Sequence, residues 1–531
     1  MTRKNSIIFH KLAGALLLLV ACAARLAAGR AADANLPIDN PPQTARAVKI
    51  YPDYSGAVVP PNIAPLNFLV QENAARYSVR ITPPEGSPVE IVSRSPTITV
   101  PISRWHALLE ANRGQSLRFD VSIQAKDSRW TQFQPFVIHV AVEDIDGYLV
   151  YRKIHPAHVM WSQIGIYQRS LRDFQESLVL DNSYSQDGCL NCHTFCNNRT
   201  DKMLLGIRSS IYGNSALLVE DGQVHKIGTT FGYTSWHPSG RLAAYSINKV
   251  IQFFHSNREE VRDVLDMDSL VAYYLVDTQT AKTAPQLAKK DRLETYPTWS
   301  PDGRYLYFCS APISWKDQST IPDRYDQIKY DLFRIPYNLQ TDQWGELQNV
   351  LLAETTGLSV LLPRISPDGR WLLFCMCDYG CFPVYQRSSD LYMIDLQAAE
   401  QTGRFEPRRL EINSDSSESW HCWSSNSRWI AFSSKRDSGA FTRIYISYVD
   451  ESGNAHKPFL LPQKDPTFYD SCLWTYSVPE LVTEPVRATK ESLGRALRSA
   501  RKIPAQMPVT SASPKAATPP GSTEPWRTHR E

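Results

Sequence analysis

The sequence lacks several features that would point to common classes of protein. Its 57 Lys and Arg residues nearly balance its 54 Asp and Glu residues, and a net charge of +3 gives no field suited to nucleic acid. The sequence has no G-x-S-x-G nucleophile elbow, no H-E-x-x-H zinc helix and no G-x-x-x-x-G-K phosphate loop. It therefore offers no motif of a serine hydrolase, a zinc protease or a P-loop nucleotide-binding protein.

Long apolar runs are also absent, except near the N-terminus. Basic residues precede the run 12–24, LAGALLLLVACAA, and an alanine-rich zone follows it. This pattern is typical of a secretory signal peptide, which we expect to span residues 1–32. Cys22 ends a stretch that resembles the lipobox of bacterial lipoproteins, so lipidation of Cys22 is the alternative to its removal with the signal. The chain is predicted to be exported to the periplasm of a Gram-negative-type envelope, with a lipid anchor as its only expected membrane contact.

Cysteines are few, but two of them form an informative motif. Cys189, Cys192 and His193 have the C-x-x-C-H spacing of covalent c-type haem attachment. Two thiols at this spacing form thioethers with the vinyl groups of one haem, and the adjacent imidazole becomes an axial ligand of the iron. A thiol redox pair or half of a zinc site is the alternative interpretation. Export favours haem c, because covalent attachment takes place on the exported side of bacterial membranes.

The second axial ligand of such a haem is not fixed by the motif. Met203 is the first choice, because a short return loop after His193 could bring its sulfur to the iron. His155, His158 and Met160 form an upstream alternative, and an open position would suit a sensor or a peroxidase. Met203 could equally be a core residue of the following strand.

The remaining cysteines are predicted to have structural roles. Without Cys22 and the haem pair seven are left, so at least one is unpaired, while some are expected to form disulfides in an exported chain. For Cys375, Cys377 and Cys381 packing or a disulfide is favoured over a metal site. We expect the same structural role for four further residues, namely Cys196, His237, His421 and Cys422.

Residues 37–150 are predicted to form a β-sandwich. Short stretches of alternating apolar and polar residues, such as 77–81 and 117–121, are separated by turns rich in Pro, Gly and Asn. About seven such strands in this length suggest an immunoglobulin- or fibronectin-like domain. Nothing in this region suggests chemistry.

A repeat follows from residue 236 onward. Trp299-Ser300-Pro301-Asp302-Gly303-Arg304 returns with small changes at 236–241, 365–370 and 423–428, each time before an aromatic or aliphatic strand. Pro-Asp-Gly favours a tight turn, so each copy predicts a hairpin. These repeats resemble the blades of TolB-like (WD40-like) propellers, and the resemblance implies a β-propeller of five or six blades over residues 203–485. The expected class is all-β.

Two segments stand outside these domains. Residues 151–202 carry the C-x-x-C-H motif and are too short for an independent cytochrome domain, so a haem there must lean on the propeller or the sandwich. Residues 486–531 are rich in Pro, Ser, Thr and Ala after a short basic stretch, and they predict a disordered tail.

Together these features predict an exported protein that carries one haem c on a propeller platform. Electron transfer, or a redox-linked role in an envelope complex with a protein partner, is the leading hypothesis. The alternative is a non-enzymatic propeller scaffold for protein or glycan, in which any haem is structural or sensory. Enzymatic activity is expected only through the haem or through an open propeller mouth.

Overall fold

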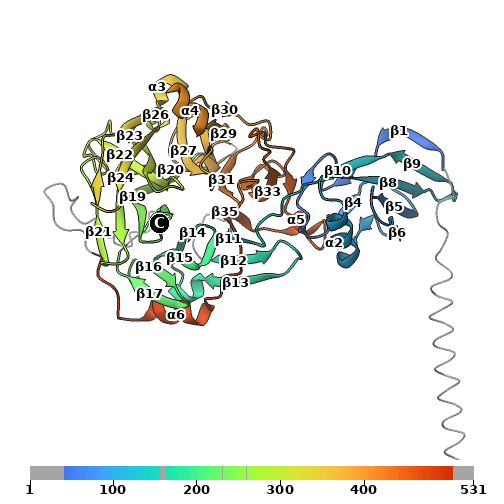
Figure 1. Ribbon diagram of the computed structural model, residues 1–531, viewed down its shortest axis with the longest axis horizontal. Helices are drawn as coiled ribbons and strands as arrows, with labels where there is room; N and C mark the ends of the chain where they lie inside the picture. The colour runs from blue at the N-terminus through green and yellow to red at the C-terminus, as the bar shows by residue number, and fades with distance from the viewer. Residues whose placement is uncertain (1–40, 156–162, 230, 257, 259, 506–531) are drawn as a thin grey trace, which may run out of the picture.

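The chain folds into a smaller N-terminal domain and a larger ring of β-sheets, seen in a computed structural model (Figure 1). The structure describes residues 41–155, 163–229, 231–256, 258 and 260–505. The predicted signal peptide, with Cys22, lies outside the described residues. Within them the chain is mostly strands, which confirms the all-β class. No helix in the described ranges is long and apolar enough to cross a membrane.

The N-terminal domain contains two sheets and one helix. The larger sheet consists of β1 (Gln43–Ala47), β3 (Val58–Val59), β5 (Arg76–Thr82), β6 (Val89–Ser93), β8 (Ser116–Gln124), β9 (Trp130–Gln134) and β10 (Phe136–Val140). The smaller sheet consists of β2 (Ile50–Tyr51), β4 (Phe68–Val70) and β7 (Thr97–Ile98). The sequence analysis missed α2 (Ile102–Ala111), which buries Trp105, Leu108 and Leu109 at helical spacing. The immunoglobulin- or fibronectin-like assignment stays a prediction.

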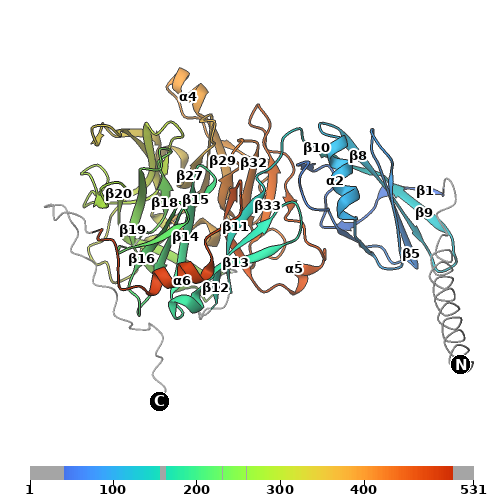
Figure 2. The ribbon, with the colours of Figure 1, turned by 60° about the horizontal axis from the view of Figure 1, so that its bottom comes forward.

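Beyond this domain, the described residues form six sheets around a common centre (Figures 1 and 2). In four of them the chain runs from strand to neighbouring strand in sequence order, as expected for propeller blades, and a fifth differs only in that β26 pairs with β24. The first two of these sheets consist of β14 (Cys189–Cys196), β15 (Arg199–Arg208), β16 (Ser215–Glu220) and β17 (Gln223–Ile227), and of β18 (Thr234–Trp236), β19 (Leu242–Phe254), β20 (Arg262–Leu275) and β21 (Thr280–Lys282). The third sheet consists of β22 (Arg292–Trp299), β23 (Tyr305–Pro312), β24 (Asp331–Asn338), β25 (Gln343–Trp344) and β26 (Gln348–Leu351). The last two consist of β27 (Ser359–Ile365), β28 (Trp371–Cys377), β29 (Asp390–Asp395) and β30 (Arg408–Arg409), and of β31 (Glu418–Trp423), β32 (Trp429–Ser434), β33 (Arg443–Tyr448) and β34 (Phe459–Leu460).

The sixth sheet closes the ring. It combines β11 (Tyr148–Ile154), β12 (Ile164–Ser170) and β13 (Glu176–Asp181) with β35 (Thr475–Val482). Strand β35 comes from the C-terminal end of the chain segment that forms the ring. β35 pairs antiparallel with β11, from Tyr148 opposite Val482 to Ile154 opposite Thr475. The structure thus assigns residues 151–202, expected to be a separate haem segment, to strands β11 to β15 of the ring.

The repeated turn owes its geometry to a serine and an acidic or amide residue. Ser300 donates its hydroxyl to Asp302 and accepts the N–H of Tyr305, while Asp302 also accepts the N–H of Arg304. The same three bonds occur in the copies that begin at Ser366 and Ser424. The predicted hairpins are therefore confirmed at these copies. The turn between β14 and β15 is formed instead by Asn197 and Asn198, at φ 51° and 59°. The Ser-Pro-Asp-Gly sequence is therefore not found at this turn.

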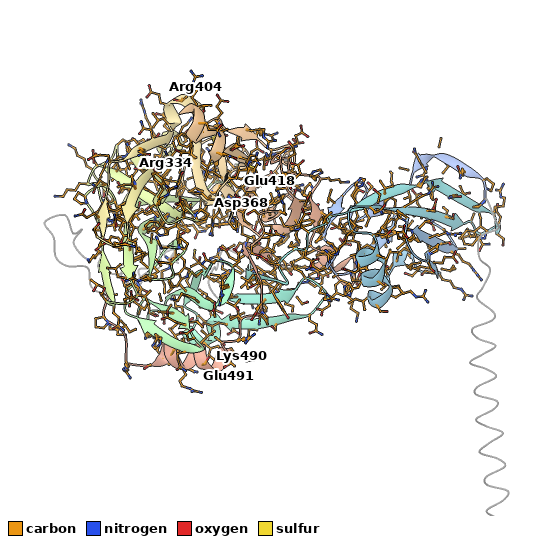
Figure 3. All side chains as sticks on the ribbon, in the orientation of Figure 1. Arg334, Asp368, Arg404, Glu418, Lys490 and Glu491 are labelled. Carbon is orange, nitrogen blue, oxygen red and sulfur yellow. The ribbon has the colours of Figure 1, made fainter. Side chains whose placement is uncertain are left out.

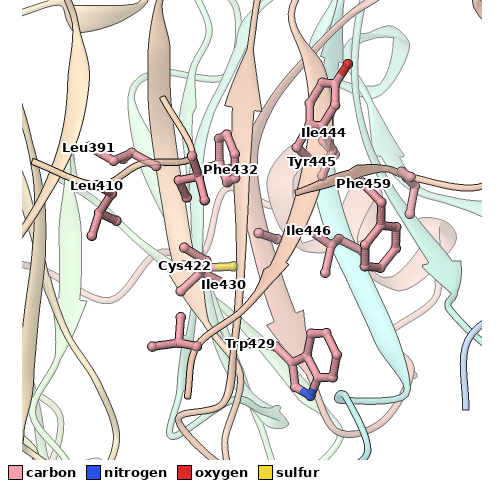
Figure 4. Packing of buried hydrophobic residues seen from close by; sticks show 14 of the residues in the cluster. Leu391, Leu410, Cys422, Trp429, Ile430, Phe432, Ile444, Tyr445, Ile446 and Phe459 are labelled. Carbon is pink, nitrogen blue, oxygen red and sulfur yellow. The ribbon is translucent and has the colours of Figure 1, made fainter. Parts of the chain in front are cut away.

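The ring is filled by apolar side chains between neighbouring sheets. Figure 4 shows part of this core, where Trp429, Ile430 and Phe432 of β32 pack near Ile444 and Ile446 of β33. One continuous apolar cluster includes residues of both the ring and the N-terminal domain. Asp146, just before β11, accepts the N–H and hydroxyl of Ser425, which also fixes the N-terminal domain to the ring.

Short helices complete the described part of the chain: η1 (Asn182–Ser185), η2 (Tyr325–Gln327), α3 (Ala353–Thr356), η3 (Pro383–Tyr385), α4 (Leu396–Thr402), α5 (Phe468–Ser471) and α6 (Lys490–Arg498). Helix α6 corrects the prediction of a disordered tail from residue 486. Leu493 and Leu497 are fully buried against the sheet of β14 to β17, and Figure 3 shows Lys490 and Glu491 at the outer edge of the ring. Residues 506–531 lie outside the described residues.

Lys226 of β17 holds this C-terminal segment. Its buried ammonium donates to the carbonyl oxygens of Tyr212, Leu497 and Ser499, and Ile503 forms a parallel bridge with Ile227. Charge-assisted bonds of this kind stabilise more than neutral ones.

We expect Lys226→Met to release the C-terminal segment. The variant loses the donors to three carbonyl oxygens, so local opening becomes easier by ~1.4 kcal/mol or more. Amide hydrogen exchange of residues 490–505 should accelerate about tenfold. Lys464→Met, at an exposed lysine, is the matched control and should leave that exchange unchanged. Equal exchange in both variants contradicts the anchoring role.

Candidate functional site

The innermost strands of the ring share an irregularity. In five of the described inner strands the pairing register shifts, and a residue other than glycine has a positive φ at the shift. These residues are Cys192 (28°), Tyr296 (53°), Leu362 (55°), Trp420 (42°) and Val478 (51°). A bulge of this kind turns a side chain away from the regular alternation of a strand. Its recurrence on five sheets points all of these bulges at one place.

That place is a cavity at the centre of the ring. It has a volume of about 500 Å³, including the part open to solvent. The five bulge residues all line it, together with Tyr233 and Thr234 at the start of β18. The remaining lining residues are His193, Pro297, Pro363, Arg364, His421 and Pro479. Its lining is mostly apolar and aromatic with a few polar groups, a composition typical of small-molecule sites.

His193 is the most informative residue of this wall. Its side chain is 2% exposed, and neither ring nitrogen has a hydrogen-bond partner. The backbone carbonyls of Val150 and Val478 are close, but neither makes a hydrogen bond of good geometry. Burial lowers the pKa of His193 to about 3, so the imidazole is neutral at neutral pH. Because buried polar groups are nearly always paired, an unpaired neutral imidazole suits a ligand or a metal ion.

The two cysteines of the motif lie in different surroundings. Cys192 lines the cavity beside His193, and burial raises the pKa of its thiol to about 11. Cys189 is buried in the apolar cluster between the sheets of β14 and β11, and its sulfur accepts from Arg208 at 3.5 Å. The structure therefore brings Cys192 and His193 together at the cavity wall. Cys189, three residues earlier on the same strand, is not among the lining residues.

The candidates for a second iron ligand are placed away from this wall. Met203 lies on β15 opposite Phe195, fully buried in the apolar cluster that also contains Cys189, and it is not among the cavity residues. This location is that of a core residue. The ring of His155 packs near Trp474 at 6.1 Å between centroids. His158 and Met160 lie outside the described residues.

The other cysteines occupy packing positions, as predicted. Cys375, Cys377 and Cys381 are buried, and their thiols donate to the backbone carbonyls of Glu418, Tyr379 and Val264. The thiol of Cys196 points at the carbonyl of His237 at 3.8 Å. No disulfide joins the described cysteines, contrary to the expectation that some would pair. Within the described ranges no group of three His, Cys, Asp or Glu residues is arranged to hold a metal ion.

Sequence reasoning missed most of the cavity wall. Tyr296, Leu362 and Val478 are each followed directly by proline, and the first two stand at the same distance before the serine of the repeated turn. Proline cannot donate to a β-ladder, so a proline recurring inside inner strands is a signal of a bulge. That signal could have located the central cavity.

Comparisons with known proteins leave the activity open. The sequence matches no protein-family model and no curated protein. Among solved structures it is similar to a puromycin-hydrolyzing peptidase of Mycobacterium tuberculosis (13% identity, 51% of this chain and 38% of that one, TM-score 0.31). It is also similar to the GH74 enzyme of Niastella koreensis (10% identity, 58% and 44%, TM-score 0.37) and to hydrazine synthase of Kuenenia stuttgartiensis (12% identity, 50% and 64%, TM-score 0.29). The chain spans less than two thirds of each, and likenesses of this extent carry no argument about function.

A second buried histidine makes the stability depend on pH. His421 is 3% exposed, its Nε2 lies 3.2 Å from the carbonyl oxygen of Leu373, and its Nδ1 lies 3.7 Å from the sulfur of Cys375. Burial, together with the smaller effect of the nearby Arg364 charge, lowers its pKa to about 3. The unfolded chain therefore binds a proton below about pH 6.5 that the folded chain refuses until about pH 3, so this contribution to stability falls as the pH falls through that window.

We expect His421→Gln to reduce this acid sensitivity. Between pH 7 and pH 4 the native protein should lose ~3 kcal/mol through His421, and the variant should lose correspondingly less. Urea unfolding at both pH values measures the difference. His225→Gln, at an exposed histidine, is the control and should behave like the native protein. If His421→Gln loses as much free energy of unfolding between pH 7 and pH 4 as the native protein, the assignment to His421 is wrong.

Proposed function

We propose that this chain is an exported c-type haem protein, in which Cys189 and Cys192 bind the haem covalently and His193 ligates the iron. The observation that carries the proposal is the unpaired, 2% exposed imidazole of His193, next to two buried thiols at haem-attachment spacing. A haem bound there would supply reversible iron redox chemistry. We further propose that the six sheets are the six blades of a TolB-like propeller, with the haem site on its axis.

The residues of the wall fit such a group in three respects. Cys192 and His193 share the wall of one cavity, so one thioether and one iron ligand are available from the same side. The imidazole is neutral at neutral pH and can offer a nitrogen lone pair. Tyr233, Tyr296 and Trp420 provide flat apolar surfaces around the cavity.

Attachment of the haem to both thiols requires Cys189 to move. Its sulfur lies in the neighbouring apolar cluster, so β14 must rearrange around the bulge at Cys192 for both thioethers to form. The bulge, with a φ of 28° at Cys192, is a point where the strand pairing is already interrupted.

The role of the protein follows from the same proposal. A covalently bound haem on an exported propeller suits electron transfer, or a redox-linked subunit of an envelope complex with a protein partner. The buried position of Cys189 favours one second candidate, a non-enzymatic propeller scaffold that binds protein or glycan and in which any haem is structural or sensory. Loss of partner binding when the haem is removed supports the redox-linked role, and unchanged binding supports the scaffold.

We expect the protein, produced with a haem c maturation system, to carry one covalent haem. Mass spectrometry should give the mass of chain plus one haem, and the reduced spectrum should have the bands of haem c. Cys189→Ala/Cys192→Ala should abolish the covalent haem, because both thioethers are lost. Cys196→Ala, which removes a third cysteine from the same strand, is the matched control and should retain it. A native protein without covalent haem, or a double variant that keeps it, rules out the proposal.

A further inference from the structure

Arg364 is the charged residue of the central cavity. It follows the bulge at Leu362 and Pro363 on β27, and it is the one Lys, Arg, Asp or Glu among the described residues that line the cavity. Its side chain is 31% exposed, although the residues around it are largely buried. The guanidinium therefore determines the charge of this wall.

One carboxylate holds Arg364 in place and leaves part of its donor set unused. Its Nη2 donates to Oε1 of Glu480 at 2.7 Å, and Glu480 lies on β35, two sheets away around the ring. Within the described part of the chain, Nε and Nη1 of Arg364 make no hydrogen bond to protein, and neither is a buried atom without a partner. These two donors thus reach the open space of the cavity. A guanidinium held at one end with donors free at the other is prepared for a second carboxylate.

A second guanidinium group lies near the same wall. Arg152 on β11 donates its Nε to the hydroxyl of Ser477 at 3.1 Å. Burial raises the pKa of Glu480, the carboxyl group that is paired with Arg364.

The aromatic walls restrict the shape of the molecule that carries the carboxylate. Tyr233 and Tyr296 have ring centroids 4.2 Å apart, and Tyr233 and Trp420 have centroids 5.8 Å apart at an interplanar angle of 33°. These rings present flat apolar surfaces to the same cavity. His193 adds one N–H donor without a partner.

From these observations we infer that the central cavity binds the carboxylate of a flat, unsaturated molecule on Arg364. Two sources share this chemistry. A propionate group of the proposed haem is one, and only this source rests on the proposed function. A free aromatic carboxylate is the other, with His193 as a second donor to its oxygens.

Benzoate binding to haem-free protein tests the second source. We use the Cys189→Ser/Cys192→Ser protein, which cannot form thioethers, and measure binding by calorimetry, with benzamide as the neutral analogue. Benzoate should bind and benzamide should not. Arg364→Gln/Glu480→Gln, which removes both charges together, should weaken benzoate about tenfold or more. Glu480→Gln alone should strengthen it, because a competing carboxylate is removed. Arg304→Gln, at a surface arginine of a repeated turn, is the matched control.

The reduction potential of haem-loaded protein tests the first source. A propionate that occupies Arg364 should prevent benzoate binding there, and Arg364→Gln should lower the potential, because a positive charge near the iron favours the reduced state. A melting curve of each variant confirms that it is folded. Arg364-dependent benzoate binding, or a lowered potential, supports the inference. Benzoate binding that is unchanged by substitution of Arg364 overturns the inference. It is also overturned if neither benzoate binding nor a lowered potential is found. Failure to find covalent haem refutes the proposed function and leaves the benzoate result standing.

Discussion

The pairing of β35 with β11 is the interaction on which the rest of the ring depends. It joins segments more than 300 residues apart and completes a sheet that would otherwise have three strands and an open edge. The innermost strand of that sheet is β35, so the pairing also supplies one wall of the cavity, formed by Val478 and Pro479, and it positions Glu480, the partner of Arg364. The same strand therefore closes the ring and lines the cavity.

The cavity in turn adds connections across the ring. Arg364 and Glu480 link two sheets that are not neighbours, since the sheet of β31 lies between them. Asn198, at the turn after β14, donates to the carbonyl oxygens of Trp423 and Leu481. It therefore links the end of β14 to the inner strands β31 and β35. Bonds of this kind fix the distances between sheets, which apolar packing alone leaves adjustable. A preorganised wall is what a binding site needs.

The sequence predicted those parts of the molecule that depend on local interactions. The Ser-Pro-Asp-Gly turn forms its hydrogen bonds within five residues, so the hairpins could be located from the repeat. The first two sheets lack that turn, and the sheet of β11 to β13 is completed by β35, a pairing between segments too far apart in the sequence for a local pattern to specify. A short basic helix at residues 490–502 was a possibility from the sequence, but its docking through Leu493 and Leu497 was not predicted, because two leucines in a polar segment are a weak signal of burial. The motif at Cys189, Cys192 and His193 was visible, whereas its position on an inner strand required the closed ring.

The recurring bulge has a further consequence for how such a site can change. Each bulge is a property of the backbone, occupied here by cysteine, tyrosine, leucine, tryptophan and valine with the same handedness. The side chain at each position can therefore be exchanged without altering the strand pairing around it, at the cost only of the local φ. A new ligand preference can therefore arise through substitutions at these five positions while the scaffold stays the same, although Tyr296 and Trp420 are in contact and would change together.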